Sequence, residues 1–219
     1  MEKQTPSSPG IRQQGYELAY RLACEQLAAT DVKQQCLRSG ARYQDANNVI
    51  VEFLNQLHLV SLPNVEISLL RSGEEVPLKN KIIILHYLTL SKGTPATGRF
   101  ITFRELPGCD SYFPVFHQLA LRPLLDRFGQ EPDLMVDAAT QLGGRRASHG
   151  HVSVTIEAFP RVPITTVLWK GDEEFPPSCS MLFDANIPDY LPTEDIRDIC
   201  ATITRKLVQS IPSPSRRER

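Results

Sequence analysis

Three short apolar segments in the last third of the chain constrain its fold more than any other feature. Val152, Val154 and Ile156 alternate with polar residues, which is the period-two pattern of a strand with one buried face. Two more strands are predicted over residues 164–169 and 180–183. A parallel pair needs a crossover of a dozen or more residues, and the connections here are shorter. The segments therefore predict an antiparallel meander.

The first half of the chain combines helices with a hairpin. Apolar residues at three- and four-residue steps predict one helix from about Tyr16 into the region of Cys36. Two β-branched-rich runs, 49–54 and 57–62, are separated by Asn55-Gln56 and predict a hairpin. The other elements predicted here are a strand over 65–69, a central apolar helix from Pro77 to about Ser91, and a strand over 100–103.

The remaining helices settle the fold class. They are predicted over 111–128 with Pro123 kinking or splitting the helix, from Pro132 to Gly143, and after Pro192 with Thr193 as the cap. Residues 143–151 are predicted to form a flexible loop. Helices and hairpins fall in blocks rather than in strict β-α-β alternation. This predicts an α+β fold, in which an antiparallel sheet made of the N-terminal hairpin and the C-terminal meander packs with about five helices.

Length and charge narrow the classes of function. The 219 residues carry a net charge of -1, which argues against a nucleic-acid binder and against docking on an anionic membrane. No apolar run approaches the roughly 20 residues that span a bilayer, and residues 1–10 lack the apolar stretch of a secretory signal. We expect a cytoplasmic protein with one α+β domain over 11–209, a flexible N-terminal lead over 1–10 and a disordered basic tail over 210–219. The oligomeric state stays open.

The cysteines predict free thiols. The chain has five of them, without a Cys-x-x-Cys pair, so neither a self-contained zinc or iron–sulfur site nor a disulfide framework is expected. Cys109 alone follows a Pro-Gly turn, and the alternative there is a reactive thiol or a ligand to an exogenous metal. No nucleophile elbow, Walker loop, dinucleotide fingerprint or His-Glu-x-x-His pattern occurs. The sequence thus encodes no cofactor by a recognisable motif and leaves open whether the protein is an enzyme.

Three adjacent carboxylates form the first candidate binding group. Asp172, Glu173 and Glu174 stand between two predicted strands. Adjacent carboxylates repel one another and could hold a hard cation or a cationic group. The alternative is a solvated hairpin turn, in which the charges blunt a sheet edge.

Two other turns carry arginines. Arg104 and Glu105 end a predicted strand, and Arg104 could bind a carboxylate or phosphate in a bidentate manner. The alternative is an internal ion pair that orients the turn. The loop 143–151 carries Arg145 and His149 between glycines, which suits an anion or, with His151, a weakly held metal. The alternative there is an exposed loop without a ligand.

Asp184 completes the set of candidate ligand-binding residues. It ends an apolar strand, where a carboxylate commonly accepts backbone hydrogen bonds in a turn. A structural role is therefore favoured over a catalytic one, although it is also an acid/base candidate.

Several motifs in one order resemble a family known as domain of unknown function 3786. The strongest match is Leu-Trp-Lys-Gly-Asp-Glu-Glu-Phe-Pro at 168–176. The others lie at 81–88, 102–108, 159–163, 182–184 and 190–195. The resemblance implies an occurrence in anaerobic bacteria and archaea, and relatives sometimes fused to a four-cysteine iron–sulfur module. This chain lacks such a cysteine cluster, so an electron-transfer role would need a partner.

Three functional hypotheses stay open, and the resemblance leads to the first of them. The first is a binding or accessory protein linked to metal-cofactor, redox or one-carbon metabolism in anaerobes, with an iron–sulfur or corrinoid protein as partner. The second is an enzyme that acts on a small anionic substrate, with a carboxylate as acid/base and Arg104 or Arg145 as anion ligand. The third is a protein-interaction domain. The first two expect the strand-end turns to converge on one recognition cleft, whereas the third expects a large exposed apolar patch and no deep polar pocket.

Overall fold

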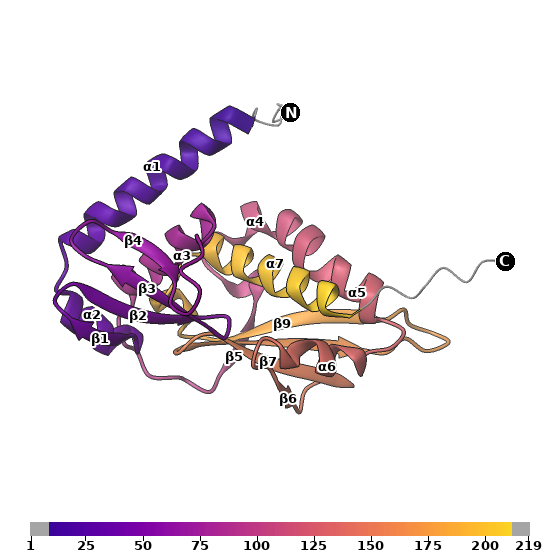
Figure 1. The fold of residues 1–219 in the computed structure, drawn as a ribbon. Helices are drawn as coiled ribbons and strands as arrows, with labels where there is room; N and C mark the ends of the chain where they lie inside the picture. Colours follow the sequence, from indigo (N-terminus) through magenta and orange to yellow (C-terminus); the bar gives the residue numbers. More distant parts are fainter. Residues whose placement is uncertain (1–8, 212–219) are drawn as a thin grey trace. The chain divides into compact units, whose positions relative to one another are not determined.

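The computed structural model describes residues 9–211, and the chain divides into two compact units. The first unit comprises residues 1–52 and 56–93, and the second comprises residues 53–55 and 94–219. Each unit has its own antiparallel sheet with helices, so the α+β class is confirmed, with the strands in two sheets rather than one (Figure 1). Within the described part of the chain, none of the helices is both long and apolar enough to cross a bilayer.

The first unit contains three helices and a four-stranded sheet among its described residues. The strands lie in chain order: β1 (Arg42–Asp45), β2 (Asn48–Phe53), β3 (Gln56–Ser61) and β4 (Glu66–Leu69). The helices are α1 (Pro9–Ala28), α2 (Val32–Ser39) and α3 (Leu78–Leu90). The α3 helix is central, as predicted, because Ile82 to Leu85 are all buried and the Tyr87 hydroxyl donates to the Ser39 carbonyl.

Two local predictions for the first 60 residues are wrong. The single helix from Tyr16 toward Cys36 is two helices, because Asp31 caps α2 by accepting a hydrogen bond from Gln34 N at 3.1 Å. The turn between β2 and β3 lies on Leu54 and Asn55, not on Asn55-Gln56, and both turn residues have positive φ (49° and 62°). That is the backbone twist of the tight hairpin turn, which overrides the side-chain preference of Leu54.

The second unit is built on the predicted meander. Its sheet has the order β5-β9-β8-β7-β6, all antiparallel. The strands are β5 (Phe100–Thr102), β6 (Arg145–Ala147), β7 (Val152–Phe159), β8 (Val162–Trp169) and β9 (Ser178–Asp184). The prediction of a flexible loop over 143–151 is wrong at its centre, because β6 pairs with β7 there. Three polar or small residues give no period-two signal, and pairing with a buried strand decides their conformation.

The helices of this unit pack on one face of its sheet. They are α4 (Cys109–Phe116), α5 (Arg122–Phe128), α6 (Leu134–Thr140) and α7 (Thr193–Ser210). In Figure 1, α4, α5 and α7 lie together on the same side of the sheet. Their face carries the buried Val154, Ile164 and Met181. The opposite face carries the hydroxyls of Ser153 and Thr165, with small 3₁₀ turns η1 (Phe103–Glu105) and η3 (Ile187–Asp189) beyond the strand ends.

Proline and threonine shape two helix boundaries. The predicted helix 111–128 is split as expected: α4 passes into a π-helical segment, η2 (His117–Leu121), and α5 follows with Pro123 in its first turn. The cap predicted for the last helix is wrong, since Pro192 occupies the cap position. Thr193 instead donates its hydroxyl to the Pro107 carbonyl at 2.6 Å.

The sequence predicts an unstructured segment at each end of the chain. The flexible lead (1–10) and the basic tail (210–219) lie outside the described residues, except that α1 begins at Pro9 and α7 ends at Ser210. The assignment of a single domain over 11–209 stays a prediction.

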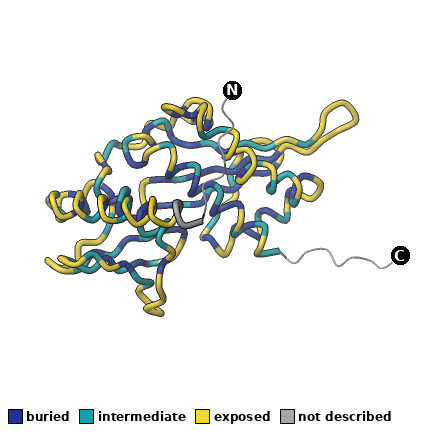
Figure 2. The backbone as a smooth tube through the Cα atoms, turned by 90° about the horizontal axis from the view of Figure 1, so that it is seen from above, coloured by how far each residue is buried: buried dark blue, intermediate teal, exposed yellow. Residues whose placement is uncertain are grey.

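Figure 2 shows that burial is concentrated in the strands and in the inner sides of the helices, while connections are exposed.

Candidate functional site

The connection between β8 and β9 extends beyond the paired strands. Trp169 and Ser178 form the last pair of the ladder, and residues 170–177 make up the hairpin tip. Residues 170–176 are all exposed, and the tip is the long exposed loop at the right of Figure 2. This hairpin, residues 170–177, holds three of the predicted site residues.

Asp172 shapes the hairpin tip from inside. Its Oδ1 accepts hydrogen bonds from Phe175 N at 2.7 Å and Glu174 N at 2.9 Å, and its own N–H donates to Phe175 O at 2.9 Å. These backbone donors lower the pKa of the Asp172 carboxyl. Asp172 is therefore an ionised turn acceptor, as in the structural alternative, and its carboxylate fixes where the next three residues lie.

The other tip residues present charge and an aromatic ring to solvent. Glu173 and Glu174 are exposed, and neither carboxylate has a hydrogen bond or ion pair with another residue in the range 9–211. Phe175 is 67% exposed, which is high for a phenylalanine, and Trp169 at the hairpin base is 37% exposed. The tip thus combines two free carboxylates with an exposed aromatic side chain.

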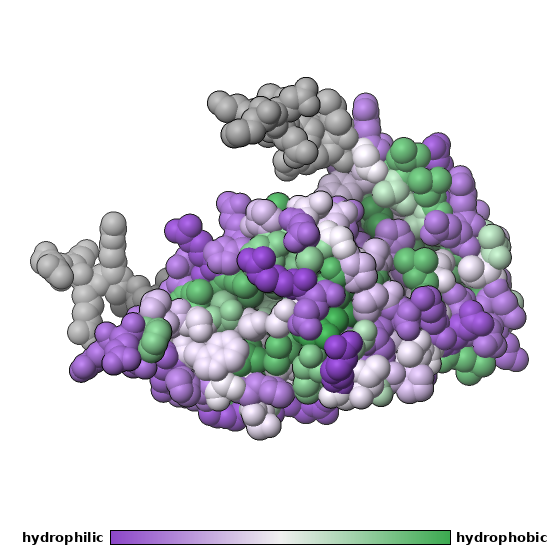
Figure 3. Space-filling view, turned by 180° about the vertical axis from the view of Figure 1, so that it is seen from behind, coloured by the Kyte–Doolittle hydropathy of each residue, from purple (hydrophilic) through white to green (hydrophobic). Residues whose placement is uncertain are grey.

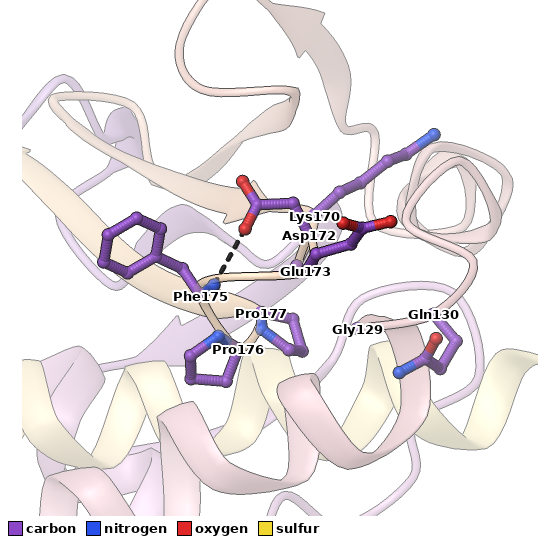
Figure 4. A pocket seen from close by; sticks show the side chains of 9 residues that line it. Gly129, Gln130, Lys170, Asp172, Glu173, Phe175, Pro176 and Pro177 are labelled. Carbon is purple, nitrogen blue, oxygen red and sulfur yellow. Dashed lines mark hydrogen bonds between the residues drawn. The ribbon is translucent and has the colours of Figure 1, made fainter.

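A polar hollow of about 430 Å³ lies beside the hairpin base. The lining residues are Gly129, Gln130, Lys170, Gly171, Asp172, Glu173, Phe175, Pro176 and Pro177. In Figure 4, the Phe175 ring points away from Gly129 and Gln130. A Cβ built on Gly129 would lie 3.4 Å from Pro177 Cγ, so the end of α5 and the hairpin base are in close contact. The hollow therefore lies between the end of α5 and the hairpin base, and its charged lining residues are Lys170, Asp172 and Glu173.

The loop before β7 supports the hairpin from the other side. His151 N–H donates to Leu168 O at 3.0 Å, and Lys170 N–H donates to His151 Nδ1 at 2.8 Å. Gly150 has φ +57°, and a Cβ there would lie 2.6 Å from Val167 Cγ1 and 3.0 Å from Leu168 O. Only glycine fits such a close approach at positive φ. The loop that precedes β7 is therefore held in close contact with the end of β8.

Arg104 and Glu105 lie at a separate place in the same unit. The Arg104 guanidinium stacks over the Phe113 ring at 3.5 Å, and Glu105 Oε2 accepts from Thr102 N at 2.7 Å and Thr102 Oγ1 at 3.0 Å. The Thr102 donors lower the pKa of Glu105. Because Thr102 pairs with Leu182, four residues along β9 from Ser178, this turn is roughly 13 Å from the hairpin base along the strand.

Asp184 lies at the other end of β9 and organises a loop. It is 6% exposed. Its Oδ1 accepts from Thr97 N, Thr97 Oγ1 and Asn186 N at 2.9–3.0 Å, and its Oδ2 accepts from Gly98 N at 2.8 Å. Burial alone would raise the pKa of this carboxyl, but the four donors outweigh burial and lower it. All of this agrees with the structural role favoured from sequence.

Arg145 and His149 are held by their own surroundings. Arg145 Nη2 pairs with Glu157 Oε1 at 2.8 Å across the β6–β7 ladder. The His149 ring contacts the Phe100 ring edge-on, with 5.0 Å between centroids, and its backbone N–H donates to Ser153 Oγ at 2.9 Å. Each of these side chains has a protein partner where the sequence suggested a ligand.

The structure therefore gathers Asp172 and Glu173 at the hollow, and leaves the Arg104 turn and Asp184 elsewhere on the sheet. Roles of these residues in ligand binding stay predictions. Sequence reasoning missed the exposed Phe175, although an aromatic residue followed by two prolines within an acidic turn is a usable signal. It also missed the hydrogen bond between Lys170 and His151, which depends on the register of β7 and β8.

The thiols are free, and burial raises the pKa of four of them, Cys24 included. Burial raises the pKa of Cys36 to about 11 and that of Cys179 to about 12, and it also raises the pKa of Cys200. The buried Cys109 donates its Sγ hydrogen to Arg104 O at 3.0 Å. Among residues 9–211, no three His, Cys, Asp or Glu side chains lie close enough to hold a metal ion.

Comparison with known proteins identifies one family. The family model described as "Domain of unknown function (DUF3786)" matches residues 31–206, which is most of the chain. No curated protein and no solved structure matches. The matched range includes both sheets and every candidate residue discussed above.

Proposed function

The chain belongs to the DUF3786 family, and we propose that it is a binding or accessory protein that docks on a partner protein through the hairpin 170–177. The observation that carries the proposal is Phe175, an aromatic side chain 67% exposed at the tip of a hairpin whose conformation is fixed. Exposed aromatic side chains on rigid elements are the usual anchors of protein interfaces, because little conformational entropy is lost when they are buried.

The fixed conformation comes from both ends of the hairpin. Asp172 holds the tip through two backbone N–H groups, and Lys170 N–H is held at the base by His151. A partner that buries Phe175 would therefore bind a preformed surface. Burying most of one phenylalanine side chain contributes about 1.5–3 kcal/mol, which is enough to make it a principal contact.

The charge of the tip points to the chemistry of the partner. Glu173 and Glu174 immediately precede the aromatic anchor and lack ion pairs within the described chain. Complementary charge raises the rate of association and selects among partners. The partner surface should therefore carry lysine or arginine around an apolar depression.

The family suggests where to look for that partner. We propose a cytoplasmic iron–sulfur or corrinoid protein, in the redox, metal-cofactor or one-carbon metabolism of an anaerobe. The separation of Arg104, Asp184 and the hairpin along β9 supports a binding role better than an acid/base enzyme that acts on a small anion, because such an enzyme needs its anion ligand and its carboxylate in one pocket.

The test is a direct binding measurement under anaerobic conditions. A purified corrinoid iron–sulfur protein and a purified ferredoxin from an anaerobe serve as probes, and titration calorimetry gives the Kd at 50 and 200 mM salt. We expect binding to one of the probes to weaken with salt and to weaken at least tenfold in Phe175→Ala. Glu174→Lys should remove most of the salt dependence.

The matched control is Leu119→Ala, which truncates another exposed apolar side chain of the same unit, 47% exposed on η2. It should leave the Kd unchanged. Binding that Phe175→Ala and Leu119→Ala weaken equally would remove the hairpin from the proposal, and the lack of binding to either probe would refute the proposed partner class.

A further inference from the structure

A side chain adds one hydrogen bond at the end of the β7–β8 ladder. Val152 pairs with Leu168, and beyond that pair His151 N–H still donates to Leu168 O. The next backbone donor, Lys170 N–H, meets His151 Nδ1 at 2.8 Å where a regular ladder would offer a carbonyl oxygen. An imidazole nitrogen thus takes the place of a backbone acceptor at the point where the hairpin leaves the sheet.

This hydrogen bond fixes the protonation state of the ring. A backbone N–H can only donate, so Nδ1 must be the unprotonated nitrogen and the hydrogen must be on Nε2. A doubly protonated imidazolium has N–H groups at both positions and cannot accept. The hydrogen bond from Lys170 N–H to His151 therefore exists only while the His151 ring is neutral.

We propose that His151 is a pH-sensitive latch, which holds the base of the hairpin 170–177 when it is neutral and releases Lys170 N–H when it is protonated. Histidine is the side chain whose charge ordinarily changes between pH 5 and 8, which makes it the usual basis of pH-sensitive contacts in proteins. The release removes the hydrogen bond from the first residue of the hairpin, immediately after Trp169.

The charged groups around the ring determine how the hairpin base responds to release. Asp172 on the hairpin lies close enough for its carboxylate to interact electrostatically with His151, whereas Lys170 contacts the ring through its backbone N–H. Lys170 is itself 3.8 Å from Asp133, which also pairs with Arg146 on β6 at 3.4 Å. His149 is in the same loop. An imidazolium at position 151 thus gains attraction to Asp172 as it loses Lys170, and the hairpin base rearranges.

The latch can be measured without any partner. In the ¹⁵N-labelled full chain, the protection factor of the Lys170 amide is followed from pH 5 to 8, beside the ring resonances of His151. A neutral hydrogen bond of ordinary strength corresponds to about a fivefold change in population, so protection should fall about fivefold as the ring protonates, with the same midpoint.

Three variants separate the latch from other pH effects. His151→Phe lacks the acceptor and should show low protection of the Lys170 amide at every pH. His151→Asn offers an amide oxygen that does not titrate, so its protection should not depend on pH. His149→Asn is the matched control, with the neighbouring histidine removed and the latch intact, and should follow the wild type.

Protection of the Lys170 amide that is constant through the titration of His151, or that is the same in His151→Phe, would overturn the inference. The effect of the latch on docking rests on the proposed function, and a separate measurement addresses it. The Kd for the probe proteins is compared at pH 6 and 8 in the wild type and in His151→Asn. A latch that opens with no change in Kd refutes the regulation alone, whereas a lack of binding at both pH values refutes the docking proposal.

Discussion

Replacing Asp184 by asparagine tests whether this carboxylate organises the loop 94–99 against the end of β9. The wild-type side chain accepts four hydrogen bonds, three at Oδ1 and one at Oδ2. Asparagine keeps the shape and one oxygen, but its NH₂ group would face the Gly98 N–H, and the remaining bonds lose their charge assistance. Hydrogen bonds to charged groups contribute about 1.5–3 kcal/mol and neutral ones about 1 kcal/mol, so we expect a loss of about 2–4 kcal/mol in the free energy of unfolding.

The assay is urea unfolding followed by the fluorescence of Trp169, the single tryptophan, which belongs to the same unit as Asp184. The folded-state pKa of Asp184 is lower than its ordinary value of about 3.9, so the carboxylate stabilises the fold above that pH, and this contribution is lost as pH falls through the lower folded-state pKa. The difference between wild type and variant should thus be constant above about pH 5 and shrink below about pH 4.

The reasoning fails if Asp184→Asn unfolds within about 0.5 kcal/mol of wild type at pH 7, or if the difference is the same at pH 7 and pH 3. Asp172→Asn provides the comparison. Its carboxylate also accepts backbone hydrogen bonds, but in an exposed turn, so its loss should be smaller than that of Asp184→Asn.

Three further predictions address other contacts. Gly150→Ala should lower the free energy of unfolding by at least about 2 kcal/mol in the same urea assay, because it adds a Cβ at positive φ within 2.6 Å of a side chain. Arg104→Ala should cost about 0.5–1 kcal/mol through loss of the stacking on Phe113, whereas Arg104→Lys should retain part of it. Iodoacetamide at pH 8 should leave Cys36 and Cys179 unmodified in the native protein and modify both in urea, as mass spectrometry can show, because their raised pKa values keep them protonated.

The sequence predicted those elements whose own pattern determines their structure. The alternation at Val152 to Ile156 and the apolar helix after Pro77 needed no long-range information, and both were found in place. The strands β1 and β6 were missed because their conformation comes from a neighbour: Arg42 to Asp45 are exposed throughout, and Arg145 to Ala147 are ordered by pairing with β7.

The candidate site shows the same limit. The acidic tip could be predicted because Asp172, Glu173 and Glu174 are consecutive. We expected the other strand-end turns to lie beside the acidic tip, which assumes that all strands end on the same side of the sheet. In an antiparallel sheet successive strand ends alternate between two edges, so Asp184 at the end of β9 lies away from the hairpin where β9 begins.

The π-helical segment between α4 and α5 has a consequence for comparing lengths within this family. A wide turn of this kind holds one residue more than a regular helical turn. A relative with one residue fewer between positions 116 and 122 would have a regular α-helical turn there, and the residues after it would keep their facing, because the wide turn has absorbed the extra residue. Leu124 and Phe128, now fully buried, would then stay in the core. A single-residue gap at this position should therefore occur together with apolar side chains at both of these positions. Figure 3 shows the face opposite to that of Figure 1, and on this face apolar and polar side chains are interspersed.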